Sequence, residues 1–88
     1  MERIRELRKK IDEIDSDIIE KLCIRMDIAK EIGMIKKDMG LKVKDTAREK
    51  ALTRRWEELS RHYELPQKRM LDVLDAILSL SREEQERV

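Results

Sequence analysis

The sequence predicts an all-α protein of three helices, one long and two shorter, that pairs with a second copy as an intertwined helical-bundle homodimer. Across residues 4–39 apolar side chains recur at steps of three and four, the period of an α-helix, and no proline interrupts them. Charged residues make up 47% of the chain and aromatic residues 2%, a composition that disordered chains and coiled coils share. The sustained period decides in favour of helices.

The long helix is predicted over residues 4–39 and is followed by Gly40, a residue type that suits the left-handed turn after a helix. Its apolar face is formed by Ile4, Leu7, Ile11, Ile14, Ile18, Leu22, Ala29, Ile32 and Ile35. A helix of this length spans roughly 54 Å, whereas a compact chain of 88 residues has a diameter of about 30 Å. We therefore expect a second chain to cover its far end.

Two shorter helices are expected after a link at residues 41–44. Asp45 is a typical N-cap for a helix that begins at Thr46 and stops before Pro66, because its carboxylate can accept free backbone N–H groups. The inner side of this helix is predicted to carry Ala51, Leu52, Trp56, Leu59 and Tyr63. The third helix, residues 67–86, presents the stripe Met70, Val73, Leu74, Ile77, Leu78 and Ser81. No linker is long enough to separate domains, so residues 1–88 are expected to form a single domain.

Charge and composition exclude several kinds of partner. Lysines and arginines number 21 and aspartates and glutamates 20, so no overall charge attracts nucleic acid or an anionic membrane. There is no signal peptide and no apolar run of about 18 residues, which predicts a cytoplasmic protein without a membrane partner. The lone Cys23 cannot form an intrachain disulfide and fits a reducing compartment.

Several polar residues occupy positions where the helical stripes would otherwise be apolar. On the long helix Arg25 and Lys36 are about 20° out of phase, so they share a face about 16 Å apart along the axis. Long side chains from these two positions can converge on one small molecule. On the third helix Ser81 and Gln85 extend the apolar line as an i, i+4 pair.

The second helix adds polar residues at its start, where Arg48 heads the apolar line and Glu49 lies beside it. Burying an unpaired charge costs several kcal/mol, so such groups are normally paired or bind a ligand. One alternative is that Arg25 and Lys36 reach solvent or pair with Glu49 and Asp45, and that the polar residues of the third helix lie on a fraying end. The occurrence of these residues on three inner faces together favours a ligand site.

Arg8 suggests a site shared between two chains. It flanks the stripe near the start of the long helix, roughly 25 Å before Arg25, so the two cannot touch one small ligand within a single straight helix. In an antiparallel dimer the Arg8 end of one long helix lies beside the middle of the other. A site that used both residues would be built from two subunits. The alternative is a solvated arginine on a charged face.

A family resemblance rests on the joint spacing of these positions. The segments that carry it are Leu7-Arg8-Lys9-Lys10-Ile11-Asp12-Glu13-Ile14-Asp15, Arg25, Gly33-Met34-Ile35-Lys36, Val43-Lys44-Asp45-Thr46-Ala47-Arg48-Glu49, Ser81 and Gln85. With this spacing the chain resembles the all-helical class of chorismate mutase over nearly its whole length.

The resemblance implies an intertwined helical homodimer with two equivalent sites that converts chorismate to prephenate, in the shikimate pathway to aromatic amino acids, without a cofactor. It implies that Lys36 and Gln85 donate hydrogen bonds to the ether oxygen of the substrate. Arg8 of the partner chain, together with Lys36, would hold the enolpyruvyl carboxylate. Arg25 and Ser81 would hold the ring carboxylate.

The resemblance also implies that Glu49 and the backbone around Asp45 take the ring hydroxyl and that Arg48 organises this corner. Arg82 departs from the expected pattern, because it puts a charge beside the pocket where an apolar residue is easier to explain. A pericyclic rearrangement needs no nucleophile, metal or proton transfer, and the sequence offers no convincing candidate for any of them. Positioned cationic donors and a folded substrate supply what this reaction needs.

Two alternative functions stay open at the level of sequence. Isochorismate pyruvate lyase shares this scaffold and the cationic pocket, and pyruvate release from isochorismate separates it from a mutase. A non-catalytic dimeric helical adapter would use its inner charges only to set the register of the helices. An adapter should show no saturable stabilisation by a dicarboxylate transition-state mimic.

Overall fold

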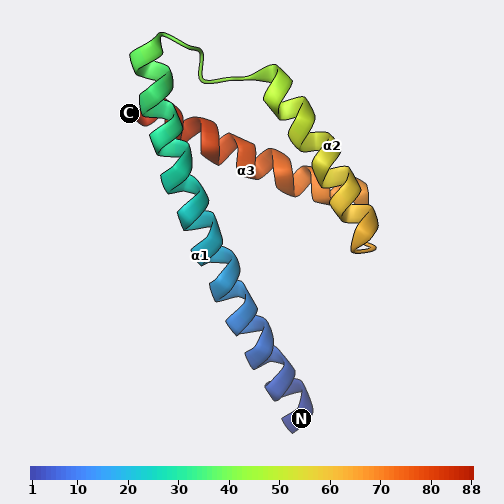
Figure 1. Ribbon diagram of the computed structural model, residues 1–88. Helices are drawn as coiled ribbons and strands as arrows, with labels where there is room; N and C mark the ends of the chain where they lie inside the picture. The colour runs from blue at the N-terminus through green and yellow to red at the C-terminus, as the bar shows by residue number, and fades with distance from the viewer.

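The computed structural model describes residues 1–88 as three helices with no strand (Figure 1). The helices are α1 (Glu2–Met39), α2 (Thr46–His62) and α3 (Gln67–Arg87). The predicted all-α class, with one long helix and two shorter ones, is confirmed. The bounds also agree closely, since α1 begins two residues before the predicted start and α3 ends one residue after the predicted end.

Local hydrogen bonds end α1 and begin α2 where the sequence predicted. Gly40 takes the left-handed conformation with φ 67°, and its N–H donates toward the carbonyls of Lys36 and Lys37. The Asp45 carboxylate accepts the backbone N–H of Arg48 at 3.0 Å and so caps the first turn of α2. These two ends fix the path of the link that borders the pocket described below.

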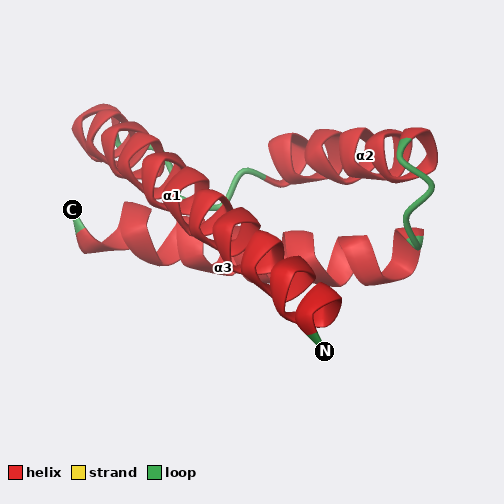
Figure 2. Cartoon of the chain, turned by 90° about the horizontal axis from the view of Figure 1, so that it is seen from below, coloured by secondary structure: helices red, strands yellow, loops and turns green.

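α3 is the helix that holds the other two in place. It packs against α1 and along α2, whereas the backbones of α1 and α2 do not come close to each other. Figure 2 shows α2 and α3 running side by side, with α1 crossing α3. The chain measures 57 × 26 × 15 Å with a radius of gyration of 16.4 Å, larger than the about 12 Å of a compact chain of this length.

The buried core is small and lies between α2 and α3. Leu52, Leu74 and Leu78 form it, and Trp56 and Leu71 pack against its edge. The stripe predicted for α3 faces the core at Leu74 and Leu78, whereas Val73 is 46% exposed and does not belong to the buried face. Only 7 of the 88 residues are buried, so this contact alone gives the chain little apolar burial for its length.

The predicted inner side of α2 needs a correction. Three of its residues are exposed, namely Ala51, Leu59 and Tyr63. Ser60 is buried instead, and its hydroxyl donates to the Trp56 carbonyl at 2.7 Å, which satisfies it away from water. Because α2 packs on α3 alone, its buried face follows the line from Leu52 through Trp56 to Ser60.

The N-terminal half of α1 extends away from the other helices (Figure 1) and carries an exposed apolar stripe. Each residue of this stripe is between 42% and 56% exposed: Ile4, Leu7, Ile11, Ile14 and Ile18. No helix has both the length and the hydropathy that a bilayer crossing requires. An exposed apolar surface of this kind is typical of a protein interface, and the intertwined homodimer stays a prediction.

Gly33 lets α3 approach α1 closely at the point where the two helices cross. A Cβ atom at this position would lie 2.7 Å from the Gln85 Cα, 2.9 Å from the Gln85 carbonyl oxygen and 3.0 Å from Val88 Cγ2. Two of these neighbours are backbone atoms, which cannot move aside as a flexible side chain can. The crossing distance therefore depends on the absence of a side chain at Gly33.

We predict that Gly33→Ala lowers the melting temperature, measured by circular dichroism at a fixed protein concentration. Alanine favours a helix over glycine by about 1 kcal/mol, but relieving an overlap in a packed contact costs about 1–3 kcal/mol. Ser16→Ala, at an exposed position of the same helix, is the control because it changes only the helix propensity. A Gly33→Ala protein that melts above the wild type would contradict this account of the crossing.

Candidate active site

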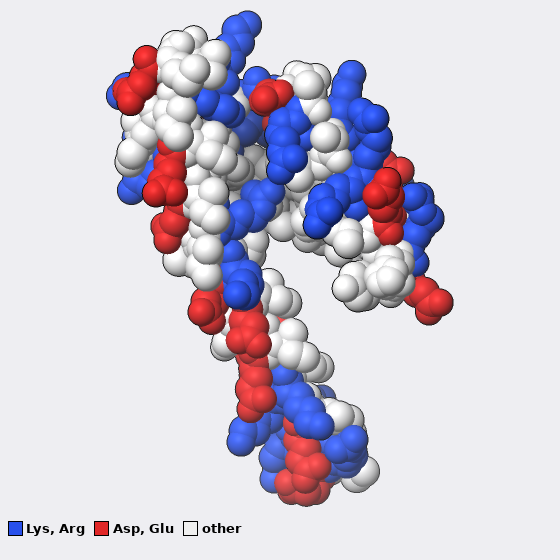
Figure 3. Space-filling view, viewed as in Figure 1, with Lys and Arg blue, Asp and Glu red and all other residues white.

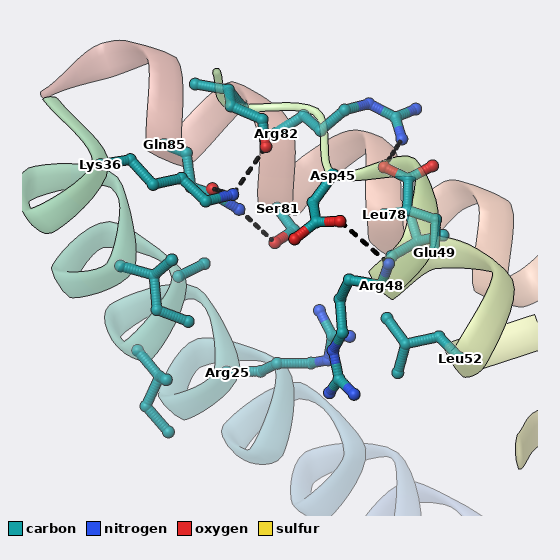
Figure 4. A pocket seen from close by; sticks show the side chains of 14 residues that line it. Arg25, Lys36, Asp45, Arg48, Glu49, Leu52, Leu78, Ser81, Arg82 and Gln85 are labelled. Carbon is teal, nitrogen blue, oxygen red and sulfur yellow. Dashed lines mark hydrogen bonds and ion pairs between the residues drawn. The ribbon is translucent and has the colours of Figure 1, made fainter. Parts of the chain in front are cut away.

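A pocket of about 420 Å³ opens between α1, the start of α2 and the C-terminal half of α3. Pockets that bind small molecules commonly measure about 300–1,000 Å³. In Figure 3 the molecule is hollowed between α1 and α2, and lysine and arginine side chains gather on both sides of the hollow. Figure 4 shows the lining side chains, which come from all three helices and from the link before α2. Its apolar walls include Ala29, Ile32, Leu52 and Leu78.

Lys36 links three segments of the chain at one end of this pocket. Its ammonium Nζ donates to the Gln85 Oε1 of α3 at 2.7 Å and to the carbonyl of Val43, in the link after α1, also at 2.7 Å. The Gln85 Nε2 in turn donates to the Ser81 hydroxyl at 3.3 Å (Figure 4). An ammonium has three N–H donors, so one donor of Lys36 is left for a ligand.

The Lys36 ammonium also fixes which way the Gln85 amide faces. An ammonium can only donate, so it selects the amide oxygen and leaves the NH₂ group on the side of Ser81 and the pocket. One N–H of that NH₂ group binds Ser81 and the other has no partner in the chain. Lys36 and Gln85 therefore each present a free donor, one charged and one neutral, from adjacent positions.

Glu49 and Arg82 form an ion pair between α2 and α3 at another edge of the pocket. Arg82 Nη1 lies 2.7 Å from Glu49 Oε2, and the two side chains are 33% and 23% exposed. Neither Glu49 nor Asp45 pairs with Arg25 or Lys36, so the ion pairs weighed in the sequence analysis as the alternative to a ligand site do not form. Both predicted carboxylates are nevertheless pocket residues.

Arg25 and Arg48 line the pocket without an ion-pair partner in the chain. Figure 4 shows their guanidinium groups extending into the same part of the pocket, one from α1 and one from α2. Two like charges that face one cavity repel each other, and an anion placed between them removes that repulsion. The pocket therefore has a place for a negatively charged group.

The formal charge of the lining supports the same conclusion. Four cationic side chains and two carboxylates line the pocket, which leaves a formal charge of +2. The whole chain carries a formal charge of only +1. The excess positive charge is thus local, and it complements a ligand with two negative charges.

Seven of the eight predicted site residues line this one pocket: Arg25, Lys36, Asp45, Arg48, Glu49, Ser81 and Gln85. Arg8 does not, because it lies exposed near the free end of α1. Helical phase is the reason for the agreement, since the residues that interrupt the apolar stripes face the same interior as the stripes. The roles of these residues in binding or catalysis stay predictions.

Two features of the pocket were missed by sequence reasoning. The first is the partner of Arg82: the sequence placed this arginine beside the pocket, but its ion pair with Glu49 depends on how α2 lies along α3. The second feature is the Val43 carbonyl that accepts from Lys36. No side-chain pattern could have revealed it, because it depends on the path of the backbone in the link.

The fold and the pocket define an all-helical protein with a locally cationic site of small-molecule size. Residues 7–86 match the family described as chorismate mutase type II, and the chain belongs to that family. The resemblance seen in the sequence is thereby confirmed.

Individual relatives agree with the family match. A chorismate mutase from Methanocaldococcus jannaschii is 36% identical to this chain over 63 residues, which are 72% of this chain and 64% of the relative. The chain thus matches just under two thirds of the length of that curated relative. A solved structure, a conserved hypothetical protein from Pyrococcus furiosus, is similar with a TM-score of 0.73 and 34% identity over 93% of both chains. The three-helix fold is shared over nearly its whole length.

Proposed function

We propose that this chain is a chorismate mutase, which converts chorismate to prephenate by an intramolecular [3,3] rearrangement. Membership of the chorismate mutase type II family supports this activity, as does the curated chorismate mutase that is 36% identical. The observation that carries the proposal is the pocket with a formal charge of +2, because chorismate is a small molecule with two carboxylates. The same site requires neither an added cofactor nor a metal for a rearrangement of this kind.

In this proposal Lys36 and Gln85 are the catalytic residues. The bond that breaks joins the ether oxygen to the ring, and negative charge builds up on that oxygen in the transition state. The free donors of Lys36 and Gln85 are held by existing hydrogen bonds before the substrate arrives, so little reorganisation is needed when the charge develops. Binding in a folded shape brings the two carbon ends together and lowers the entropic part of the barrier.

The remaining residues of the pocket would bind the substrate. Arg25 with Ser81 would hold the ring carboxylate, which places the anion beside a guanidinium that has no partner in the chain. Glu49, with the backbone around Asp45, would accept a hydrogen bond from the ring hydroxyl. Arg48, held at the first turn of α2 by the Asp45 cap, would organise this corner.

We further infer that the active form is an intertwined homodimer in which the partner chain supplies Arg8. Supporting this inference, the exposed apolar stripe and Arg8 lie on the same half of α1, away from the chain's own pocket. An antiparallel copy that covered the stripe would bring its Arg8 toward the middle of the first α1. That guanidinium would join Lys36 in holding the enolpyruvyl carboxylate.

We also propose that residues 1–88 act as one chorismate mutase domain in the cytoplasm, with chorismate as the partner and no nucleic acid or membrane surface. The free Cys23 supports a reducing compartment. The near balance of 21 basic and 20 acidic residues supports the absence of a polyanionic partner.

The experiment that tests the activity follows the loss of chorismate absorbance with the purified chain. We predict that Lys36→Ala lowers turnover by about a hundredfold to a thousandfold or more, the loss typical for removal of one charge-stabilising donor, while helicity is unchanged. Lys9→Ala, at an exposed position of α1, is the control. Near-normal turnover by Lys36→Ala, pyruvate release from isochorismate, or no reaction with either substrate would each overturn the assignment.

The pH dependence tests the role of Gln85. The wild-type rate should be flat across neutrality because an amide donates at any pH, whereas Gln85→Glu should be active only in acid, where the carboxyl is protonated and can donate. The Lys36 ammonium, 2.7 Å from the present amide oxygen, favours the ionised carboxylate and pushes the active range further into acid. Equal Gln85→Glu rates at about pH 5 and pH 8, relative to wild type, would exclude contact with the ether oxygen.

Subunit mixing tests whether Arg8 acts across the interface. Arg8→Ala and Lys36→Ala should each be nearly inactive alone. In a mixed dimer one site would combine the intact Lys36 of one chain with the intact Arg8 of the other, and the second site would lack both. An equimolar mixture, after exchange of subunits, should recover about a quarter of the wild-type rate, because half of the dimers are mixed and each has one whole site. No recovery would mean that Arg8 does not act from the partner.

A further inference from the structure

The proposed mechanism assigns no role to the ion pair between Arg82 and Glu49. This pair joins the first turn of α2 to the C-terminal half of α3 at 2.7 Å, and both side chains are less than two-fifths exposed. Both residues line the pocket (Figure 4). The pair is therefore part of the wall of the site and differs from the other ion pairs of the chain, which join residues three apart on one helix.

The contact engages only one oxygen of the Glu49 carboxylate. Arg82 Nη1 binds Oε2, and no other hydrogen bond to the Glu49 carboxylate is present in the chain. The Oε1 oxygen is thus left free to accept a hydrogen bond, while the ion pair at Oε2 restricts how the carboxylate can turn.

Glu49 has two other cations within the same pocket that could compete for it. Arg25 from α1 and Arg48 from α2 both line the pocket and both lack an ion-pair partner. A Glu49 carboxylate released from Arg82 would be attracted to these guanidinium groups and would turn away from the position in which it can accept a hydrogen bond from the ring hydroxyl. The remaining charged groups of the lining are Lys36, which is bound to Gln85 and Val43, and Asp45, which caps α2.

We propose that Arg82 is a positioning residue that holds Glu49 away from Arg25 and Arg48 and aims its free oxygen at the ring hydroxyl of the substrate. Arg82 thereby determines the preference of the site for a hydroxylated ring. This inference rests on the proposed function, in which Glu49 accepts a hydrogen bond from that hydroxyl. It also explains why an arginine occupies a pocket position of α3 where an apolar side chain would fit a simple wall.

The proposal is tested with two ligands, five proteins and one matched control variant. The ligands are an oxabicyclic dicarboxylic acid that mimics the transition state and the same compound without its hydroxyl group. The proteins are wild type, Arg82→Met, Arg82→Lys, Glu49→Gln and the double variant Arg82→Met/Glu49→Gln. Dissociation constants are measured by calorimetry, and kcat and KM are measured with chorismate. Arg87→Met, which removes an exposed ion pair with Glu84 from the same helix, is the matched control.

We expect Arg82→Met to bind the hydroxylated mimic about tenfold more weakly, the usual scale for loss of a hydrogen bond to a charged group. Binding of the mimic without the hydroxyl should change much less. With chorismate the loss should appear in KM more than in kcat, because the hydroxyl takes no part in bond breaking. The double variant should be no weaker than Glu49→Gln alone, since both changes remove one interaction. Arg82→Lys should recover most of the loss, and Arg87→Met should resemble wild type.

Other outcomes would overturn the proposal. Equal weakening of both mimics by Arg82→Met would make Arg82 a direct partner of a carboxylate. If the losses of binding free energy in the two single variants added up in the double variant, Arg82 and Glu49 would act independently of each other. If Arg82→Met lowered the melting temperature but left the selectivity between the two mimics unchanged, the ion pair would only stabilise the packing of α2 on α3. If wild type bound the mimics without converting chorismate, the proposed function would be wrong. The two dissociation constants would still show whether Arg82 affects recognition of the hydroxyl group. Absence of any binding would overturn both proposals.

Discussion

The contact between Lys36 and Gln85 joins the fold of this chain to its site. The Lys36 ammonium ties α1 to the end of α3 and to the Val43 carbonyl of the link, at 2.7 Å in both cases. Gly33 lies one turn before Lys36 on α1, and the close approach of the helices depends on it. The backbone crossing therefore fixes where Gln85 lies relative to Lys36. A site that relies on aligned donors needs this constraint.

The pocket of this chain holds more positive charge than the chain itself neutralises. Arg25 and Arg48 have no ion-pair partner, although four basic and two acidic side chains face the same cavity. A chain under selection for stability alone would pair these groups or replace them with apolar residues. The small core between α2 and α3 leaves little reserve to offset such repulsion. The excess of cations is thus better explained by a dianionic ligand than by the folding of the single chain.

Helical phase made much of this structure predictable from sequence. The period of the apolar stripes placed Lys36 and Gln85 on inner faces, and the types of Gly40 and Asp45 fixed two helix ends. The partner of Arg82 was not predictable, because Glu49 is 33 residues away and the pair depends on how α2 lies along α3. The exposed faces of α2 were missed for a related reason: a stripe on one helix does not tell how many neighbours will cover it.

The N-terminal half of α1 carries both an apolar stripe that its own chain leaves uncovered and an arginine that does not reach its own pocket. Its apolar stripe, about half exposed, and Arg8 both lie beyond the reach of α3. In the proposed dimer a single event would bury the stripe and bring another guanidinium to each pocket. Burial of apolar surface gives the free energy that holds this cation near the others against their repulsion. Assembly would therefore act as the step that completes the binding charge, and the separated chain would be both less stable and less able to bind a dianion.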